Sequence, residues 1–246
     1  MKTFFIVSFL LAAIIASAEN WHQFRGPTGM GVAEGDVPTQ WSNASVAWKI
    51  EIPGQGQSSA VNWGSKLFVT AASKGGGIRT LLCLDKETGE TLWRRDVSTD
   101  QKEALHKMNR WATPSAVTDG ERVVAFFGPA GIHCFDMEGK KQWSKDLGEF
   151  PGNWGLAASP VIEGDQLIQN CDATGPSRLV SLDKKTGKLL WETKRDDKPR
   201  GGWSTPILIK TKKGEQLVLN GEFGAKGYDP LKGNELWFCK DRKSTR

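Results

Sequence analysis

The sequence has few of the residues from which metal sites and nucleophilic active sites are usually built. Its 246 residues include three histidines, His22, His106 and His133, and four cysteines that form no Cys-x-x-C pair. No histidine lies at metal-ligand spacing from a second ligand or near a G-x-S-x-G motif. The sequence therefore predicts no metal site, and it identifies no catalytic residue.

A strong excess of one charge is also missing. Thirty-three lysines and arginines stand against 28 acidic residues, a formal net charge of +5, and lysines and acidic residues are interspersed in hairpin turns such as "DKKTGK". No basic stripe forms of the kind that binds a phosphate backbone. We predict no nucleic-acid partner.

The chain has one long apolar run, and it lies at the N-terminus. Phe4 to Ala16 follows Lys2 and ends in Ala16-Ser17-Ala18, the small-x-small form that signal peptidase cleaves. The run is short for a membrane span, and no second one follows. Residues 1–18 are predicted to be a secretory signal, with residues 19–246 exported to the periplasm or the extracellular space. No cysteine stands at the cleavage point to carry a lipid anchor.

Amphipathic helical periodicity is absent after residue 18, except over 100–111. The sequence instead contains a repeat. The hairpin motif "LLCLDKETGETLW" at 81–93 recurs in similar form at 132–143, 179–191 and 225–237. Its aspartates are spaced by 51, 47 and 46 residues and its tryptophans by 50, 48 and 46. Each unit of about 46 residues holds four short β-rich runs, which is the pattern of a β-propeller blade.

The fold class predicted is therefore all-β, a β-propeller with four four-stranded blades. The blades are predicted at 53–99, 111–149, 157–196 and 203–240, and residues 46–52 repeat a fourth strand that has no blade. In each hairpin the Asp is expected to accept turn amides, the Gly to supply positive φ, and the Trp to pack between blades. These twelve residues are Asp85, Gly89, Trp93, Asp136, Gly139, Trp143, Asp183, Gly187, Trp191, Asp229, Gly233 and Trp237.

The cysteines follow the same repeat. Cys83 and Cys134 stand two residues before the hairpin aspartate, where the other two units have Ser181 and Gly227. A position that accepts Cys, Ser and Gly is a slot for a small side chain. The spacing therefore argues against a disulfide framework.

"CLDKETGETLW" and "SLDKKTGKLLW" resemble the tryptophan-docking repeat of the pyrroloquinoline-quinone-like (PQQ-like) propeller family, over residues 48–240. That family includes the quinoprotein alcohol dehydrogenases and the BamB-like propeller of the outer-membrane barrel assembly machinery. "WHQFRGP", "HKMNRWATPSAV" and "LIQNCD" resemble secreted bacterial members in particular. The resemblance implies a ring of seven or eight blades, so four blades predict a truncated chain. A closed four-bladed ring and a pairing of two halves are the alternatives.

Propeller ligands usually lie over the central channel, on loops that join the fourth strand of one blade to the first of the next. Here these loops are rich in glycine, aromatic and amide residues. The candidate ligand-binding side chains are Gln55, Gln57, His106, Asn109, Arg110, Trp111, Asn153, Trp154, Arg200 and Trp203. They could stack a flat ligand or hold a peptide or a sugar, or they could pack the tops of the blades.

The resemblance also sets requirements for quinone catalysis. Dehydrogenases of the family use a calcium ion, a catalytic aspartate, a tryptophan floor and an adjacent Cys-Cys ring. This chain has no adjacent cysteines, and its loops 53–59, 106–114, 150–160 and 198–206 contain no Asp or Glu. We therefore predict a non-catalytic binding or protein-interaction scaffold of the cell envelope, with a protein or small ligand at the channel face and no cofactor. The alternative is a PQQ-dependent dehydrogenase with calcium, or a degenerate relative of one.

Overall fold

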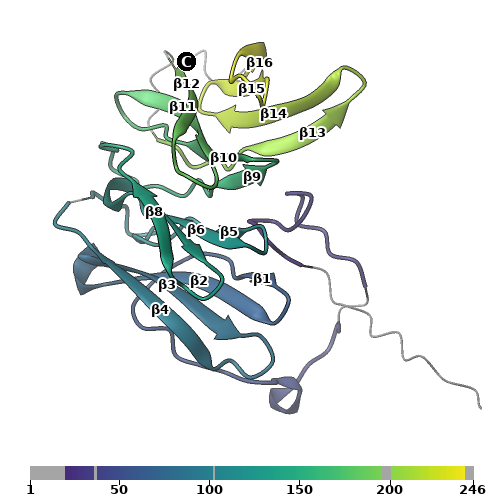
Figure 1. The fold of residues 1–246 in the computed structure, drawn as a ribbon, viewed down its shortest axis with the longest axis vertical. Coiled ribbons are helices and arrows are strands. Elements are labelled where there is room, and N and C mark those ends of the chain that lie inside the picture. The colour runs from purple at the N-terminus through teal and green to yellow at the C-terminus, as the bar shows by residue number, and fades with distance from the viewer. Residues whose placement is uncertain (1–19, 36–37, 102, 196–200, 242–246) are drawn as a thin grey trace, which may run out of the picture.

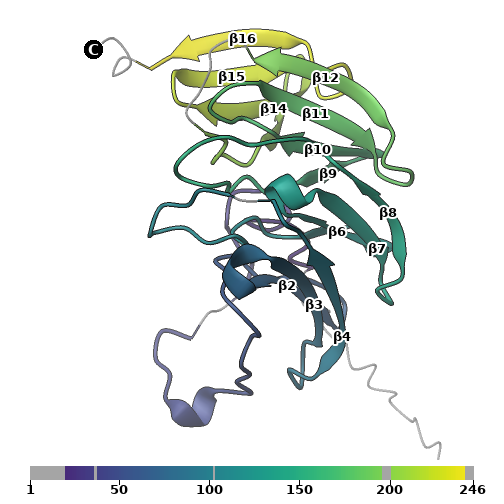
Figure 2. The same cartoon turned by 90° about the vertical axis from the view of Figure 1, so that its left-hand side faces the viewer.

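The computed structural model describes residues 20–35, 38–101, 103–195 and 201–241, so the predicted signal at 1–18 lies outside it. The described chain forms four antiparallel sheets of four strands, each in sequential order. Figure 1 shows the sheets following one another along the long axis of the molecule, and Figure 2 shows the same succession from the side. The predicted all-β propeller architecture with four four-stranded blades is confirmed.

Each sheet consists of four strands that follow one another in the sequence. The first two blades consist of β1 (Val61–Trp63), β2 (Lys66–Ser73), β3 (Ile78–Asp85), β4 (Thr91–Ser98), β5 (Val117–Thr118), β6 (Arg122–Phe126), β7 (Ile132–Asp136) and β8 (Lys141–Lys145). The last two consist of β9 (Val161–Glu163), β10 (Gln166–Asn170), β11 (Ser177–Asp183), β12 (Leu189–Arg195), β13 (Ile207–Thr211), β14 (Gly214–Gly221), β15 (Gly224–Tyr228) and β16 (Glu235–Lys240).

Three short 3₁₀ turns, η1 (Asn43–Ser45), η2 (Lys74–Gly76) and η3 (Gly128–Ala130), are the helical elements of the described chain. Residues 103–111, where the sequence allowed an amphipathic helix, form a loop instead. Residues 46–52 carry the pattern of a fourth strand but pair with no strand in the described chain. Within the described residues, no helix has the length and apolar character needed to cross a bilayer.

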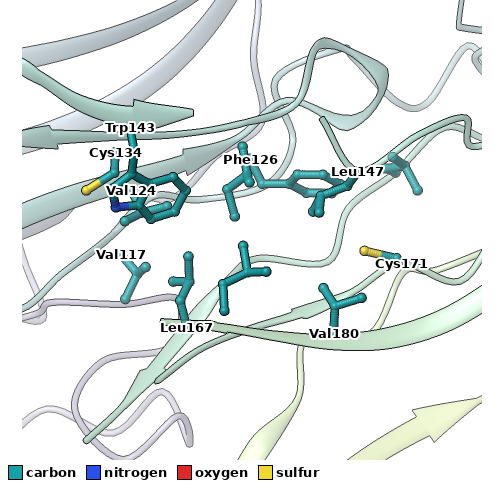
Figure 3. Packing of buried hydrophobic residues seen from close by; sticks show 12 residues of the cluster. Val117, Val124, Phe126, Cys134, Trp143, Leu147, Leu167, Cys171 and Val180 are labelled. Carbon is teal, nitrogen blue, oxygen red and sulfur yellow. The ribbon is translucent and has the colours of Figure 1, made fainter. Parts of the chain in front are cut away.

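The core lies between neighbouring blades. Val124 and Phe126 of the second blade face Leu167 and Val180 of the third, and all four side chains are buried (Figure 3). Comparable clusters join the first blade to the second and the third to the fourth. Burying one such side chain contributes roughly 1.5–3 kcal/mol, so these blade-to-blade contacts are a main source of stability.

The hairpin tryptophan of each blade lies over the turn glycine of the next. A Cβ atom on Gly139 would stand 2.7 Å from the Trp93 ring, and one on Gly187 would stand 2.6 Å from the Trp143 ring. The Trp93 and Trp143 indole N–H groups donate to backbone carbonyls of the same turns, at 3.0 Å in both cases. The Trp191 ring also covers Gly233, but its indole N–H donates to Gln166 Oε1 of its own blade. A bare glycine backbone is what allows the indole to approach so closely.

Trp48 extends this series on the N-terminal side of the first blade. Its ring would meet a Cβ on Gly89 at 2.6 Å, and its Nε1 donates to the Lys86 carbonyl at 2.9 Å. Residues 46–52 therefore place an indole on the first blade as a preceding blade would.

The turn aspartates organise the hairpins through their side chains. Oδ1 of Asp85 accepts the amides of Glu87 and Thr88, both at 2.9 Å. Asp136, Asp183 and Asp229 likewise accept amides from their own turns. Each carboxylate satisfies amides that the chain reversal leaves without a strand partner.

The small-residue slot lies beneath the indole of its own blade. Cys83 pairs across the sheet with Trp93, Cys134 with Trp143, and Gly227 with Trp237. All four cysteines are free thiols, and Cys83, Cys134 and Cys171 are buried. Burial raises the pKa of the Cys83 and Cys134 thiols to about 12, so both remain protonated at neutral pH.

A series of hydroxyl groups connects the segments just before the first strand of each blade, that is, before β1, β5, β9 and β13. The Ser59 amide donates to Ser115 Oγ at 2.9 Å, the Ser115 amide to Ser159 Oγ at 2.9 Å, and the Ser159 amide to Thr205 Oγ1 at 3.0 Å. This hydroxyl series (Ser115, Ser159 and Thr205) satisfies the backbone amides of Ser59, Ser115 and Ser159. It also fixes each blade against the next at the inner edge.

Candidate ligand cleft

Loops that lead into the second, third and fourth blades meet in an open cleft of about 410 Å³. Its lining consists of His106, Met108, Asn109, Trp154 and Trp203. Three of these residues are large, apolar and exposed: Met108 is 74%, Trp154 48% and Trp203 42% accessible. We refer to these five residues as the aromatic cleft.

The aromatic rings of the cleft are held in a defined arrangement. The His106 ring stacks on Trp154, with centroids 4.3 Å apart and planes inclined by 28°. The Trp154 and Trp203 indoles stand nearly perpendicular, at 75° and 6.4 Å. Trp203 Nε1 donates to the Gly155 carbonyl at 2.9 Å, and Asn109 Nδ2 donates to the Trp154 carbonyl at 2.7 Å. These bonds tie the loops to one another and pre-organise the cleft.

Beneath the cleft lies a buried carboxylate that the sequence analysis missed. Glu103 Oε2 lies 3.0 Å from Arg79 Nη2 of β3, and the two side chains are 4% and 0% exposed. Burial raises the pKa of Glu103 to about 7, although the Arg79 charge acts in the opposite direction. Burial likewise lowers the pKa of Arg79. The loop interval considered from sequence begins at residue 106, three positions after Glu103.

The other sequence-predicted residues surround the cleft rather than line it. Gln55, Gln57 and Arg110 line an adjoining cavity of about 570 Å³. Gln57 Nε2 donates to the Met108 carbonyl, and Arg110 donates to carbonyls of its own loop. Trp111 packs against Gly76, and Asn153 is exposed beside Trp154. Arg200 lies outside the described residues.

A second cavity, of about 690 Å³, lies between the N-terminal segment and the first strands of the third and fourth blades, β9 and β13. Trp203 lines both this cavity and the aromatic cleft, so the two spaces adjoin at its indole. Glu163 and Glu215 line the cavity on the side of the blades. Burial and the neighbouring Glu215 carboxylate raise the pKa of Glu163.

The N-terminal segment reaches this cavity because its backbone forms hydrogen bonds with β1 and β5, the first strands of the first two blades. The Trp21 carbonyl accepts the Asn62 amide of β1, and the His22 carbonyl accepts the Thr118 amide of β5, each at 2.9 Å. Both bonds cover edge positions that would otherwise lack a partner.

The cleft has the aromatic rings that could stack a quinone but lacks the carboxylates that would hold its calcium ion. Perpendicular indoles can stack a flat ring, but the residues that line the cleft include no carboxylate for a calcium ion. Glu103 is committed to Arg79 and to the Leu156 amide. Among the described residues, no group of three His, Cys, Asp or Glu side chains is placed to hold a metal ion. The cleft offers stacking, apolar contact and a few amide and imidazole groups.

Comparison with known proteins identifies the family. A PQQ-like repeat model described as outer membrane protein assembly factor BamB matches residues 33–205 and again 79–240, which together span most of the chain. The chain belongs to this BamB-like propeller family. All four blades lie within the matched residues.

Curated relatives of the chain include dehydrogenases. A polyvinylalcohol dehydrogenase of Pseudomonas sp. is 25% identical over 212 residues, covering 72% of this chain and 31% of the relative. A 1-butanol dehydrogenase (cytochrome c) of Thauera butanivorans is 34% identical over 111 residues, covering 39% of this chain and 15% of the relative. The chain therefore spans less than a third of the length of these relatives.

Solved structures show the same fold. BamB from Moraxella catarrhalis is similar with a TM-score of 0.52 and 16% identity, over 78% of this BamB-like chain and 51% of that one. A quinohemoprotein alcohol dehydrogenase from Pseudomonas putida HK5 is similar with a TM-score of 0.64 and 12% identity, over 90% and 40%. At such identities the likeness concerns the fold alone.

Proposed function

We propose that this protein is a non-catalytic binding module of the cell envelope that engages a protein partner through the aromatic cleft. The observation that carries the proposal is the gathering of Met108, Trp154 and Trp203, all large and exposed, at one place on the channel-facing loops. Aromatic residues and methionine are enriched at protein interfaces, and tryptophans often dominate their energetics. The hydrogen bonds of Trp203 and Asn109 reduce the entropy that binding would otherwise cost.

The partner feature expected is a large apolar side chain on an extended or looped segment. A cleft of about 410 Å³ accommodates one or two rings or a branched aliphatic group. Lys107 and the Arg110 side chain stand on the same loop, and the residues that line the cleft carry no acid. A partner segment with neutral or acidic residues around its apolar anchor is therefore favoured over a basic one.

A displayed library of twelve-residue peptides, selected on the wild-type protein, tests this function. Selected peptides should share a large apolar anchor and bind at least tenfold more weakly to the W154A and W203A variants. The W41A variant is the matched control, because Trp41 is 78% exposed and does not line the cleft. Peptides that bind W154A, W203A and wild type equally, or a selection that yields none, would count against a protein-binding cleft.

The second candidate is a quinone-dependent dehydrogenase, and the observation in its favour is the perpendicular indole pair that could stack a planar cofactor. Relatives named as polyvinylalcohol and butanol dehydrogenases belong with this candidate. Incubation with PQQ and calcium, followed by absorbance of bound cofactor and dye-linked oxidation of alcohols or sugars, distinguishes the two. The binding-module proposal expects neither signal.

We also propose that the protein is exported from the cytoplasm. The apolar run at Phe4–Ala16 and the small-x-small site before Glu19 support it. N-terminal sequencing of the protein recovered from a bacterial periplasm should begin at Glu19. Full-length protein retained in the cytoplasm would contradict export.

A further inference from the structure

The first seam, between the first and second blades, differs in its side-chain chemistry from the two seams that follow. A cavity of about 510 Å³ opens there between β4 of the first blade and β7 and β8 of the second. Its lining includes three basic side chains, Arg95, Lys140 and Lys141, and the imidazole of His133. We refer to these four residues as the seam pocket. The cavity shares no lining residue with the aromatic cleft.

Because the blades are copies, the equivalent positions of the other seams show what the fold alone requires. Counted from the hairpin tryptophan and the turn glycine, the second seam has Lys145, Lys188, Leu189 and Val180 at these positions, and the third has Thr193, Asn234, Glu235 and Lys226. Thr193 Oγ1 donates to the Gly233 carbonyl at 2.6 Å. Arg95 Nε makes the same contact with the Gly139 carbonyl. A threonine therefore meets the packing requirement, and a guanidinium is more than the fold needs.

His133 departs from the repeat in another way. Leu82 and Val180 stand at its position in the first and third blades, and both are buried apolar side chains. His133 is only 8% exposed, so the second blade buries an imidazole where its neighbours bury a hydrocarbon. Its Nε2 lies 2.8 Å from the Ala130 carbonyl, which can only accept, so Nε2 carries the proton. Nδ1 is therefore an acceptor, and it is buried without a partner among the described residues.

The charges around this acceptor are mostly positive. Burial lowers the pKa of His133, and the nearby Lys141 acts in the same direction, so the ring is neutral at pH 7. Asp96 is the acid that lines the pocket, and its Oδ1 already accepts Arg94 Nε at 2.8 Å and Thr80 Oγ1 at 2.7 Å. The three basic side chains outnumber this one carboxylate. An anion is therefore favoured in the pocket over a cation.

We propose that the seam pocket binds a phosphate group that still carries a proton. The three basic side chains bind the phosphate oxygens, and the P–O–H group donates to His133 Nδ1. Hydrogen phosphate at pH 7 supplies both features, because it is a dianion with one hydroxyl group. Sulfate has the same charge and nearly the same shape but no proton, so it would leave Nδ1 without a donor. This site is additional to the proposed binding function and does not depend on it.

Isothermal titration calorimetry with inorganic phosphate and with sulfate, at pH 7 and low ionic strength, tests the inference. The wild-type protein should bind phosphate at least about tenfold more tightly than sulfate, because phosphate alone satisfies the buried acceptor. The H133L variant has the side chain that the first blade carries at this position, as Leu82. It should bind the two anions with equal, weakened affinity.

The basic side chains are tested with a double variant and a control of equal charge. K140Q/K141Q should bind both anions at least about tenfold more weakly than the wild type, because two of the three cations are lost. K185Q/K188Q removes two exposed lysines from the equivalent turn of the third blade, outside the pocket. It should bind phosphate as the wild type does.

Equal affinity of the wild type for phosphate and sulfate, or no phosphate binding at millimolar concentration, would overturn the inference. A K140Q/K141Q variant that binds like its control would do the same. Nitrogen-15 NMR of the His133 ring in the wild type needs no variant: phosphate, and not sulfate, should shift the Nδ1 resonance. An unchanged resonance at saturating phosphate would contradict the role of His133.

Two further probes identify the source of the phosphate group. Glycerol phosphate and vesicles that contain phosphatidic acid are titrated beside inorganic phosphate at pH 6, where a phosphate monoester retains about half of its second proton. Tightest binding of inorganic phosphate indicates a free ion, of glycerol phosphate a small ester, and of the vesicles a lipid headgroup. Because the peptide selection reports on the aromatic cleft, either result can fail while the other stands.

Discussion

At the scale of single residues, the joints between blades depend on glycines that an indole covers. Gly139 and Gly187 have positive φ and also lie in contact with a tryptophan of the preceding blade. Gly164 has positive φ in the β9–β10 turn, but nothing lies within 4 Å of where its Cβ would stand. A comparison of the two kinds of glycine therefore separates the cost of a left-handed backbone conformation from the cost of close packing against an indole.

Gly187→Ala should therefore cost more stability than Gly164→Ala. The Gly164 change places a Cβ in a left-handed conformation in open space, at about 1–2 kcal/mol. Gly187→Ala adds a Cβ 2.6 Å from the Trp143 ring, which raises the expected loss to about 2–5 kcal/mol. Urea unfolding followed by circular dichroism measures both; equal losses would show that the indole moves aside at little cost.

His133 should make the stability of the fold sensitive to acid. Its Nε2–H donates to the Ala130 carbonyl at 2.8 Å, and burial lowers its pKa below the ordinary value of 6.5. The unfolded chain therefore binds the proton more readily, and stability that is present above pH 6.5 is lost as the pH falls toward the folded pKa. The slope for one proton is at most about 1.4 kcal/mol per pH unit.

His133→Gln retains an amide donor for Ala130 and removes the titration. The unfolding free energy of the wild type, minus that of the variant, should decrease between pH 8 and pH 5. Because Glu103 is present in both proteins, its opposite contribution cancels in the difference. A difference independent of pH would show that His133 titrates alike in the folded and unfolded states.

At the scale of elements, the loops before the inner strands combine two tasks. Ser115 and Ser159 open the inner strands of neighbouring blades and belong to the hydroxyl series, while His106 and Trp154 on the preceding loops form the cleft. The hydroxyl series was not read from the sequence, because Ser115 follows a proline whereas Ser159 and Thr205 precede one. The hydroxyl series is continuous in space, but relative to the repeated proline Ser115 lies two positions later than Ser159 and Thr205.

Ser159→Ala should lower the unfolding free energy by about 1–3 kcal/mol, since the buried Ser115 amide loses its acceptor. Ser98→Ala, at an exposed position of β4, is the control and should change stability by less than about 0.5 kcal/mol. Thermal unfolding measures the pair. An unchanged Ser159→Ala protein would indicate that the Ser115 amide finds another acceptor, such as water.

At the scale of the whole molecule, the sequence predicts the blades well and the site only in outline. The all-β class and the four four-stranded sheets follow from a repeat of about 46 residues, because each copy must present the same packing faces to its neighbours. The loops that form the cleft follow from propeller topology. The propeller topology does not predict which side chains converge. The Arg79–Glu103 pair, for example, joins a strand to a loop 24 residues later, and no local sequence pattern marks it.

Trp48→Ala tests whether residues 46–52 contribute to the whole fold. Trp48 connects them to the first blade through Gly89 and the Lys86 carbonyl. Loss of the indole should lower the unfolding free energy by about 1–3 kcal/mol and increase proteolytic cleavage around these residues. Trp41→Ala, at a 78% exposed side chain, should leave both unchanged. Identical behaviour of the two variants would assign residues 46–52 no role in stability.

The indole-on-glycine contact has a direction: the earlier blade always supplies the ring, and the later one the uncovered backbone. At this contact, any copy that keeps both the indole and the turn glycine can therefore follow any other. In-frame recombination between the tandem copies in the gene would then insert or delete a blade and preserve the indole-on-glycine contact at the new joint.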